Sequence, residues 1–244
     1  MSFVVSLPQK RSRSLPDLLK AALAGFGVVA AQFSWAADLS PAPDLTIRAI
    51  SGAMPVDHID RKTTALLVID FQNEYFTGRL PIPDGMKALE NTQRLIRFAD
   101  GANLPVIHVR HVAPKDSPVF AAGSEGVGFH PLMMPRAHDR TLSKTTVSVF
   151  ASTDLDAELK RAGIKTVIVA GLMTHACVAG AARDAVPLGY SVVVASDATA
   201  TRAITVKDTQ SVSADELHRS ALASIEDTFG DVMTTERITL LPVQ

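Results

Sequence analysis

The chain has little of several residue types, and each shortage excludes a class of protein. Its 244 residues contain one cysteine, one tryptophan and two tyrosines. A single cysteine cannot form an intrachain disulfide and cannot build a zinc site from thiolates. The formal net charge is −1, so the chain lacks the basic field that attracts nucleic acid or acidic membranes. We therefore expect no nucleic-acid partner and no disulfide scaffold.

The N-terminal segment differs in character from the rest. Basic side chains precede the uncharged apolar run AALAGFGVVAAQF, and Ser34 and Ala36 follow at the spacing of a small-x-small cleavage site. This arrangement predicts a secretory signal peptide over 1–37, and hence a periplasmic or secreted mature protein without a membrane segment. The alternative is an amphipathic helix in a cytoplasmic protein. Residues 38–60 read as an N-terminal arm or linker, and 61–244 as one folded domain.

The folded part alternates between strand and helix patterns. Such alternation indicates right-handed βαβ units and a parallel sheet covered on both faces. We therefore predict an α/β fold, a three-layer αβα sandwich with a mostly parallel central sheet. The strands are expected at 64–70, 104–110, 166–171, 191–197 and within 231–238, and the helices at 84–101, 153–163, 176–188 and 213–229. Residues 111–142 read as a long loop, a feature that is usually functional.

Three residues fall where such a sheet binds its ligand, outside the carboxyl ends of the strands. Asp70 ends the first strand, Cys177 starts a helix, and Lys144 lies between them in the chain. A thiol at a helix N-terminus beside a lysine is favoured as thiolate, and a carboxylate can take its proton. This set suits acyl transfer from an amide to sulfur, followed by hydrolysis. The residues alone leave other roles open: Cys177 as a buried hydrophobe, Asp70 as a helix cap and Lys144 as a solvated charge.

Three segments resemble the signatures of the isochorismatase-like cysteine hydrolases, which include nicotinamidases and N-carbamoylsarcosine amidohydrolase. They are LLVIDFQNEYF (66–76), LSKTTVSVF (142–150) and GLMTHACVAGAARDAVPLGYSVVVASDATATR (171–202). The resemblance covers about residues 62–237 and implies the isochorismatase-like hydrolase fold.

The resemblance also implies the roles of the site residues. Cys177 is then the nucleophile, Asp70 the general acid/base, and Lys144 the residue that steadies the charge between them. A cis peptide bond at Leu172–Met173 places the backbone N–H of Met173 beside that of Cys177 as an oxyanion hole. Homo-oligomers are common in this superfamily, so we expect one here.

Two departures from the family narrow the expected chemistry. Nicotinamidases carry an Asp-x-His pair and another histidine that bind a metal, whereas this chain has HVRHVAP at 108–114. On a strand, His108 and His111 point to opposite faces, so we expect no metal and no cofactor. True isochorismatases lack the nucleophilic cysteine, so Cys177 favours amide or ureide-like substrates over an ether.

The sequence thus predicts a metal-independent cysteine hydrolase that cleaves a C–N bond of a small molecule through a thioester. Asp197 and Arg202 read as structural residues. Two alternatives stay open: a non-catalytic binding or assembly member of the fold, and an ether or ester hydrolase on the same scaffold. The candidate substrate-pocket residues are Phe71, Gln72, Tyr75, His175 and Phe150.

Overall fold

A computed structural model of the protein describes residues 44–207 and 210–244. The predicted signal peptide and the first part of the predicted arm lie outside the described residues. Within the described ranges, no helix combines the length and apolar character needed to cross a membrane.

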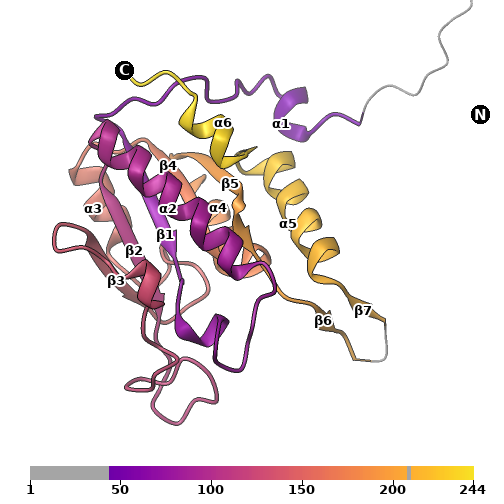
Figure 1. The fold of residues 1–244 in the computed structure, drawn as a ribbon. Helices are drawn as coiled ribbons and strands as arrows, with labels where there is room; N and C mark the ends of the chain where they lie inside the picture. Colours follow the sequence, from indigo (N-terminus) through magenta and orange to yellow (C-terminus); the bar gives the residue numbers. More distant parts are fainter. Residues whose placement is uncertain (1–43, 208–209) are drawn as a thin grey trace, which may run out of the picture. The chain divides into compact units, whose positions relative to one another are not determined.

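Six parallel strands form the central sheet, in the order β3-β2-β1-β4-β5-β8 (Figure 1). The predicted parallel sheet is thereby confirmed. Every residue of β1 is buried, as expected for a central strand covered on both faces. The strands are β1 (Thr64–Ile69), β2 (Val106–His111), β3 (Arg140–Lys144), β4 (Thr166–Leu172), β5 (Ser191–Ala200) and β8 (Asp231–Met233).

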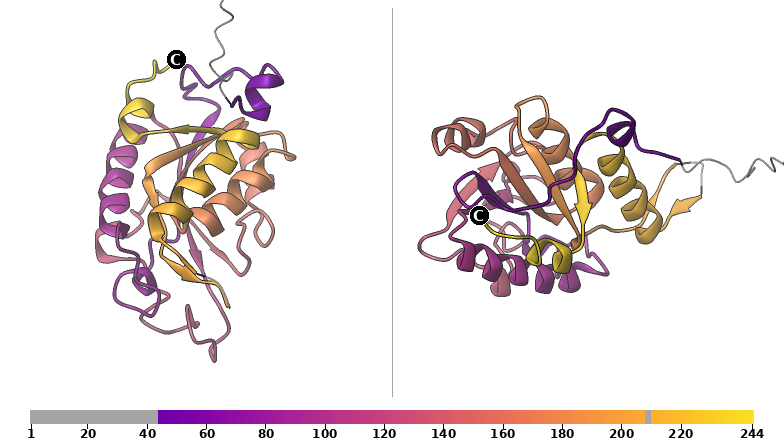
Figure 2. Two further views of the ribbon diagram at one scale, coloured as in Figure 1. Left: turned by 90° about the vertical axis from the view of Figure 1, so that its right-hand side faces the viewer. Right: turned by 90° about the horizontal axis from the view of Figure 1, so that it is seen from above.

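Helices cover both faces of the sheet, which gives the expected three layers (Figure 2). Alternate side chains of β1 enter different clusters, because successive residues of a strand point to opposite faces. Leu66 and Val68 pack in the cluster of α2 (Gly85–Ala102) and α6 (Thr235–Thr239). Leu67 and Ile69 pack in the cluster of the helices on the other face, which are α3 (Leu155–Arg161), α4 (Ala179–Ala185) and α5 (Ala214–Thr228).

Short elements connect these layers. Ser213 and Glu216 form the predicted capping box at the start of α5. The remaining elements are α1 (Ile47–Ile50), the short helical turns η1 (Asn73–Tyr75), η2 (Pro131–Met133) and η3 (Thr174–Val178), and the hairpin strands β6 (Ile204–Thr205) and β7 (Ser211–Val212).

Three predicted elements differ from the structure. The long loop predicted over 111–142 contains η2 and most of β3, an edge strand whose sequence RTLSK has only one apolar residue and so gives no hydrophobic run. The last predicted strand ends at Met233, after which Thr234 caps α6. The helix predicted from Ala176 begins earlier, as the π-helical turn η3.

The described part of the arm is bound to the domain. The guanidinium of Arg48 lies 2.6 Å from Oδ1 of Asp231. Oδ2 of Asp231 accepts a hydrogen bond from the backbone N–H of Val56. Ile59 forms a β-bridge with Val243. Residues 44–60 therefore belong to the folded unit and do not act as a free linker.

We predict that Gly171→Ala destabilises the protein by about 2 kcal/mol, the cost of overpacking a tight core. Gly171 has φ 147° and pairs with Ile69, and a Cβ there would lie 2.3 Å from the Ile69 carbonyl oxygen. Urea denaturation measures the change. Gly101→Ala, in open space on α2, serves as the control and leaves stability unchanged or raises it. Equal stability of the Gly171 variant and the wild type would contradict the packing described here.

Candidate active site

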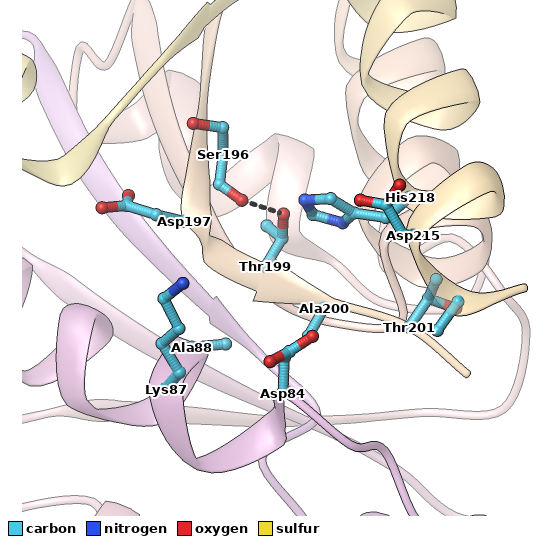
Figure 3. Close-up of a pocket in the computed structure, with 11 residues that line it drawn as sticks. Asp84, Lys87, Ala88, Ser196, Asp197, Thr199, Ala200, Thr201, Asp215 and His218 are labelled. Atoms are coloured by element: carbon cyan, nitrogen blue, oxygen red, sulfur yellow. Dashed lines mark hydrogen bonds between the residues drawn. The ribbon is translucent and has the colours of Figure 1, made fainter. Parts of the chain in front are cut away.

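A pocket opens at the carboxyl end of β5 and is lined by residues of β5, α2 and α5 (Figure 3). Asp70, Lys144 and Cys177 are not among its lining residues. Two of the lining residues contact the turn η3, which contains the only cysteine. His218 of α5 lies 2.9 Å from the hydroxyl of Thr174, and the hydroxyl of Thr201 lies 2.6 Å from Nδ1 of His175. The turn η3 is thus fixed to α5 and to the segment after β5.

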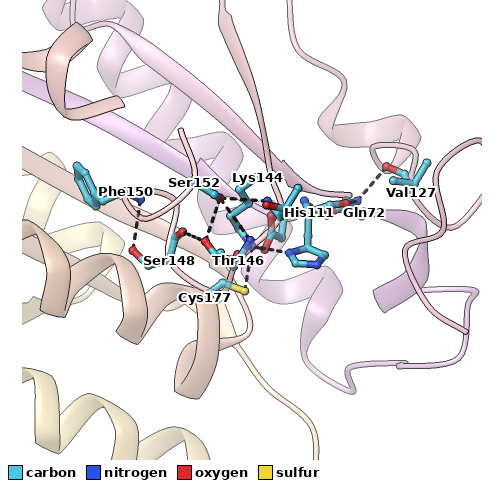
Figure 4. Close-up of polar contacts among 11 residues, drawn as sticks. Gln72, His111, Val127, Lys144, Thr146, Ser148, Phe150, Ser152 and Cys177 are labelled. Carbon is cyan, nitrogen blue, oxygen red and sulfur yellow. Dashed lines mark hydrogen bonds and ion pairs between the residues drawn. The ribbon is translucent and has the colours of Figure 1, made fainter. Parts of the chain in front are cut away.

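The structure brings Asp70, Lys144 and Cys177 together. Nζ of Lys144 lies 2.8 Å from Oδ2 of Asp70 and 3.3 Å from Sγ of Cys177 (Figure 4). Asp70 and Lys144 are completely buried, and Cys177 is 6% exposed. Both contacts are within hydrogen-bonding distance, so the ammonium of Lys144 bridges the Asp70 carboxylate and the Cys177 sulfur.

Strand order explains why a lysine occupies this position. The strand order reverses between β1 and β4, and Asp70 and Cys177 follow these two strands. Lys144 ends β3, two strands away from β1, and neighbouring strands are spaced by about 4.8 Å. The long stem of a lysine can carry its ammonium across β2 to the carboxylate.

The backbone at Asp70 turns out of the strand in a left-handed conformation. Asp70 has φ 56°, which costs a non-glycine residue on the order of 1 kcal/mol. Its N–H still donates to Val109 of β2 at 2.8 Å, while its carbonyl accepts from the N–H of Gln72. These two bonds hold the turn that aims the carboxylate at Lys144.

Burial is the largest single influence on the pKa values of the three residues in this centre. It raises the pKa of the Cys177 thiol to about 12, and the Asp70 carboxylate adds to this rise while Lys144 opposes it. Burial likewise raises the pKa of Asp70. Burial lowers the pKa of Lys144, but attraction to Asp70 and Cys177 outweighs it, and the net pKa is raised. The sequence suggested a lowered thiol pKa, but burial exceeds the opposing effect of Lys144 and the pKa is raised.

The peptide bond Leu172–Met173 is cis, as the family resemblance implies. It immediately precedes η3, the turn that contains Cys177. The oxyanion hole formed by the N–H groups of Met173 and Cys177 stays a prediction.

The predicted pocket residues lie in different surroundings. Phe71 is buried in the core and does not line an open pocket. Tyr75 is also buried, which raises its pKa, and the Asp70 carboxylate adds to this rise. Phe150 stacks on Tyr190 with a centroid separation of 5.8 Å, a packing contact.

Gln72 and His175 have structural contacts as well. The amide of Gln72 is fully buried and bonds to the backbone at His111 and Val127, so it is not free to bind a substrate. His175 is half-buried and contacts Thr201. Of the five predicted pocket residues, His175 and Phe150 keep part of their surface exposed.

Two residues near the centre were not assigned to it from the sequence. Nδ1 of His111 lies 3.3 Å from Nζ of Lys144. The charge of Arg202 acts on both Tyr75 and His175, and its Nε is buried without a hydrogen-bond partner among the described residues. Asp197, in contrast, bonds to the backbone and hydroxyl of Thr235, which fits the structural role predicted for it. The sequence did contain one signal that could have assigned His111 to the centre, which is its position at the end of a strand.

The two histidines of β2 do not converge on one site. Nε2 of the buried His108 lies 3.3 Å from Asp139, away from Lys144 and His111. Across 44–207 and 210–244, no three His, Cys, Asp or Glu side chains are grouped so that they can hold a metal ion. The residues present therefore do not fit a metal centre.

Comparison with known proteins places the chain in a family. The family profile described as "Isochorismatase domain" matches residues 64–237. The chain belongs to the isochorismatase family. The isochorismatase family protein YddQ of Bacillus subtilis is 34% identical over 71% of this chain and 97% of its own length. A cysteine hydrolase from Pseudomonas syringae pv. phaseolicola 1448A has a similar structure, with a TM-score of 0.72, 27% identity, and coverage of 81% of this chain and 97% of that one.

Other members of the isochorismatase family have more informative names. The secreted isochorismatase effector Isc1 of Verticillium dahliae is 31% identical over 76% of this chain and 95% of its own length. Maleamate amidohydrolase of Pseudomonas putida is 29% identical over 70% of this chain and 83% of its own length. The relatives thus include hydrolases of amide-type bonds.

We predict that Lys144→Met destabilises the fold by about 3 kcal/mol, because it leaves the buried Asp70 carboxylate without its partner. The double variant Asp70→Asn/Lys144→Met regains most of this loss, since no charge then remains unpaired. Urea denaturation of the two variants measures both effects. Lys160→Met, which removes an exposed ion pair with Asp156, is the control and changes stability by less than about 0.5 kcal/mol. A Lys144→Met variant as stable as this control would show that the pair is not held as described.

Proposed function

We propose that the protein is a metal-independent cysteine hydrolase that cleaves the C–N bond of a small amide or ureide through a thioester at Cys177. The contact of the Lys144 ammonium with both the Asp70 carboxylate and the Cys177 sulfur is the observation that carries this proposal. The amide hydrolases among the relatives support the class of bond.

The first half-reaction conserves the charge of the buried centre. Asp70 takes the thiol proton, and Sγ of Cys177 attacks the carbonyl carbon. The pKa of the free thiol is raised because an isolated second anion is costly here. Transfer of the proton to Asp70 avoids that cost, since one anion replaces another beside the Lys144 ammonium. Asp70 then serves as the general base that its position allows.

The C–N bond breaks as the protonated Asp70 gives its proton to the departing nitrogen, which leaves as ammonia or an amine, and this completes the first half-reaction. In the second half-reaction, water attacks the thioester and Asp70 accepts its proton. The C–S bond then breaks, the acid product departs, and Asp70 returns the proton to the sulfur. The N–H groups of Met173 and Cys177 are the proposed donors to the oxyanion in both halves.

The alternatives predict different geometry or different substrates. A non-catalytic binding member does not require a carboxylate, an ammonium and a thiol in mutual contact inside the protein. An ether or ester hydrolase would use the same centre on another bond. A panel of amides, ureides, esters and vinyl ethers tests which of these bonds the protein cleaves. Each class includes neutral and anionic compounds, because the nearby Arg202 carries a positive charge.

We predict that Cys177→Ala loses at least about 1000-fold in kcat on any amide that the wild type hydrolyses, because the nucleophile is gone. The variant keeps its fold, since the substitution removes only a sulfur atom, and its circular dichroism spectrum matches that of the wild type. Ammonia release measures turnover, and the intact mass of wild type quenched in acid shows the acyl adduct. A Cys177→Ala variant with unchanged turnover would refute the thioester mechanism.

We predict that exhaustive dialysis against EDTA leaves amide turnover unchanged, because the described residues offer no metal-binding group. The same ammonia assay measures activity before and after dialysis, with added zinc as the comparison. A clear loss that zinc restores would contradict metal independence and would direct the search to residues outside the described ranges.

We further propose that residues 1–37 direct export and that the mature protein is a homo-oligomer acting outside the cytoplasm on a small molecule. The basic start, the apolar run and the small-residue cleavage site support export. The secreted relative Isc1 gives independent support.

A further inference from the structure

His111 contacts the catalytic lysine from a side that the proposed mechanism does not use. Nδ1 of its imidazole lies 3.3 Å from Nζ of Lys144. In the sheet, β2 lies between β1 and β3, and His111 is paired in register with Lys144. The Lys144 side chain must cross the end of β2 to reach Asp70, and His111 is the residue at that end (Figure 4).

The ammonium of Lys144 has three protons and no lone pair, so its neighbours must accept. In the resting centre Cys177 is a thiol, and thiol sulfur is a weak acceptor. Three stronger acceptors surround Nζ: Oδ2 of Asp70 at 2.8 Å, the carbonyl oxygen of Thr146 at 3.2 Å and Nδ1 of His111 at 3.3 Å. His111 therefore supplies the third acceptor for the three protons.

This role requires a neutral imidazole with its proton on Nε2. Burial lowers the pKa of His111, and the charge of Lys144 from β3 lowers it further. Asp70 from β1 and the backbone of Thr146 oppose this shift without reversing it. His111 is therefore neutral near pH 7, and in the tautomer protonated on Nε2 its Nδ1 accepts a hydrogen bond from Lys144.

The surrounding residues fix the backbone of His111 and contact its ring. Oε1 of Gln72 accepts a hydrogen bond from the backbone N–H of His111 at 2.7 Å, and Nε2 of Gln72 donates to the backbone carbonyl of His111 at 2.8 Å. The same Nε2 donates to the carbonyl of Val127 at 2.9 Å, which joins the loop to this position. The ring of Phe120 meets the imidazole edge-on at a centroid distance of 5.4 Å.

We propose that His111 is a positioning residue that holds the Lys144 ammonium between Asp70 and Cys177. The inference rests on the proposed function, because it assigns His111 a task in the same centre. Without His111, one ammonium proton is left with only the weakly accepting sulfur of Cys177, and the long lysine stem is held less firmly. Small displacements of a catalytic group reduce the rate strongly.

The test compares His111→Leu, which fills the space without an acceptor, with His111→Asn, whose Oδ1 restores one near the position of Nδ1. Each is made in the wild type and in Lys144→Met, and His138→Leu, at an exposed histidine, is the control. Three quantities are measured: kcat and KM on an amide substrate, the rate of Cys177 alkylation by iodoacetamide, and the midpoint of urea denaturation. The last two need no substrate, so they test His111 even if no amide is hydrolysed.

We expect His111→Leu to lower kcat and the alkylation rate about tenfold, the worth of one hydrogen bond to a charged group, with little change in KM. His111→Asn recovers most of both rates. In Lys144→Met, the leucine substitution has no further effect on alkylation or on the denaturation midpoint. Three results would each overturn the proposal. The first is wild-type rates in His111→Leu, and the second is a His111→Asn variant as slow as His111→Leu. The third is a loss of alkylation rate or stability in His111→Leu that adds to the loss caused by Lys144→Met. A wild-type thiol that is never alkylated would overturn both this inference and the proposed function.

Discussion

The buried ion pair between Asp70 and Lys144 is the constraint on which the rest of the site depends. Both side chains are fully buried, so neither charge is tolerable without the other. The pair therefore fixes how the ends of β1 and β3 meet, and the thiol of Cys177 is placed against it by the turn after β4. An uncharged core would cost less free energy to bury than this ion pair. We therefore attribute the pair to the proposed catalysis and not to stability.

The same pair changes how the thiol is activated. The thiol keeps its proton at rest, because burial and the Asp70 charge raise its pKa to about 12. In the proposed mechanism, Asp70 accepts the thiol proton, so a negative charge on sulfur replaces the one on the carboxylate. The centre thus holds one positive and one negative charge before and after proton transfer, and the ammonium of Lys144 contacts both possible sites of the negative charge.

Much of the fold was predictable because its signals are local. The apolar runs of β1, β4 and β5 and the capping box of Ser213 mark elements that the structure confirms. Edge strand β3 has no such run, so residues 111–142 read as one loop. The thiol pKa was predicted with the wrong sign, because helix and lysine effects are visible in the sequence whereas the depth of burial is not. Gln72 was assigned to the pocket because sequence proximity to Asp70 does not reveal that its amide bonds to the backbone 39 residues away.

The importance of His111 follows from topology more than from its own motif. With β2 placed between β1 and β3, any lysine that ends β3 and pairs with Asp70 must pass over the residue that ends β2. The side chain at the end of β2 therefore lies next to a cation, and a neutral imidazole can accept a hydrogen bond from that cation. Knowledge that β3 exists would therefore have been enough to select His111 from the sequence. The failure to predict β3 and the failure to assign His111 have the same cause, because the position of β3 determines which residue lies next to the Lys144 ammonium.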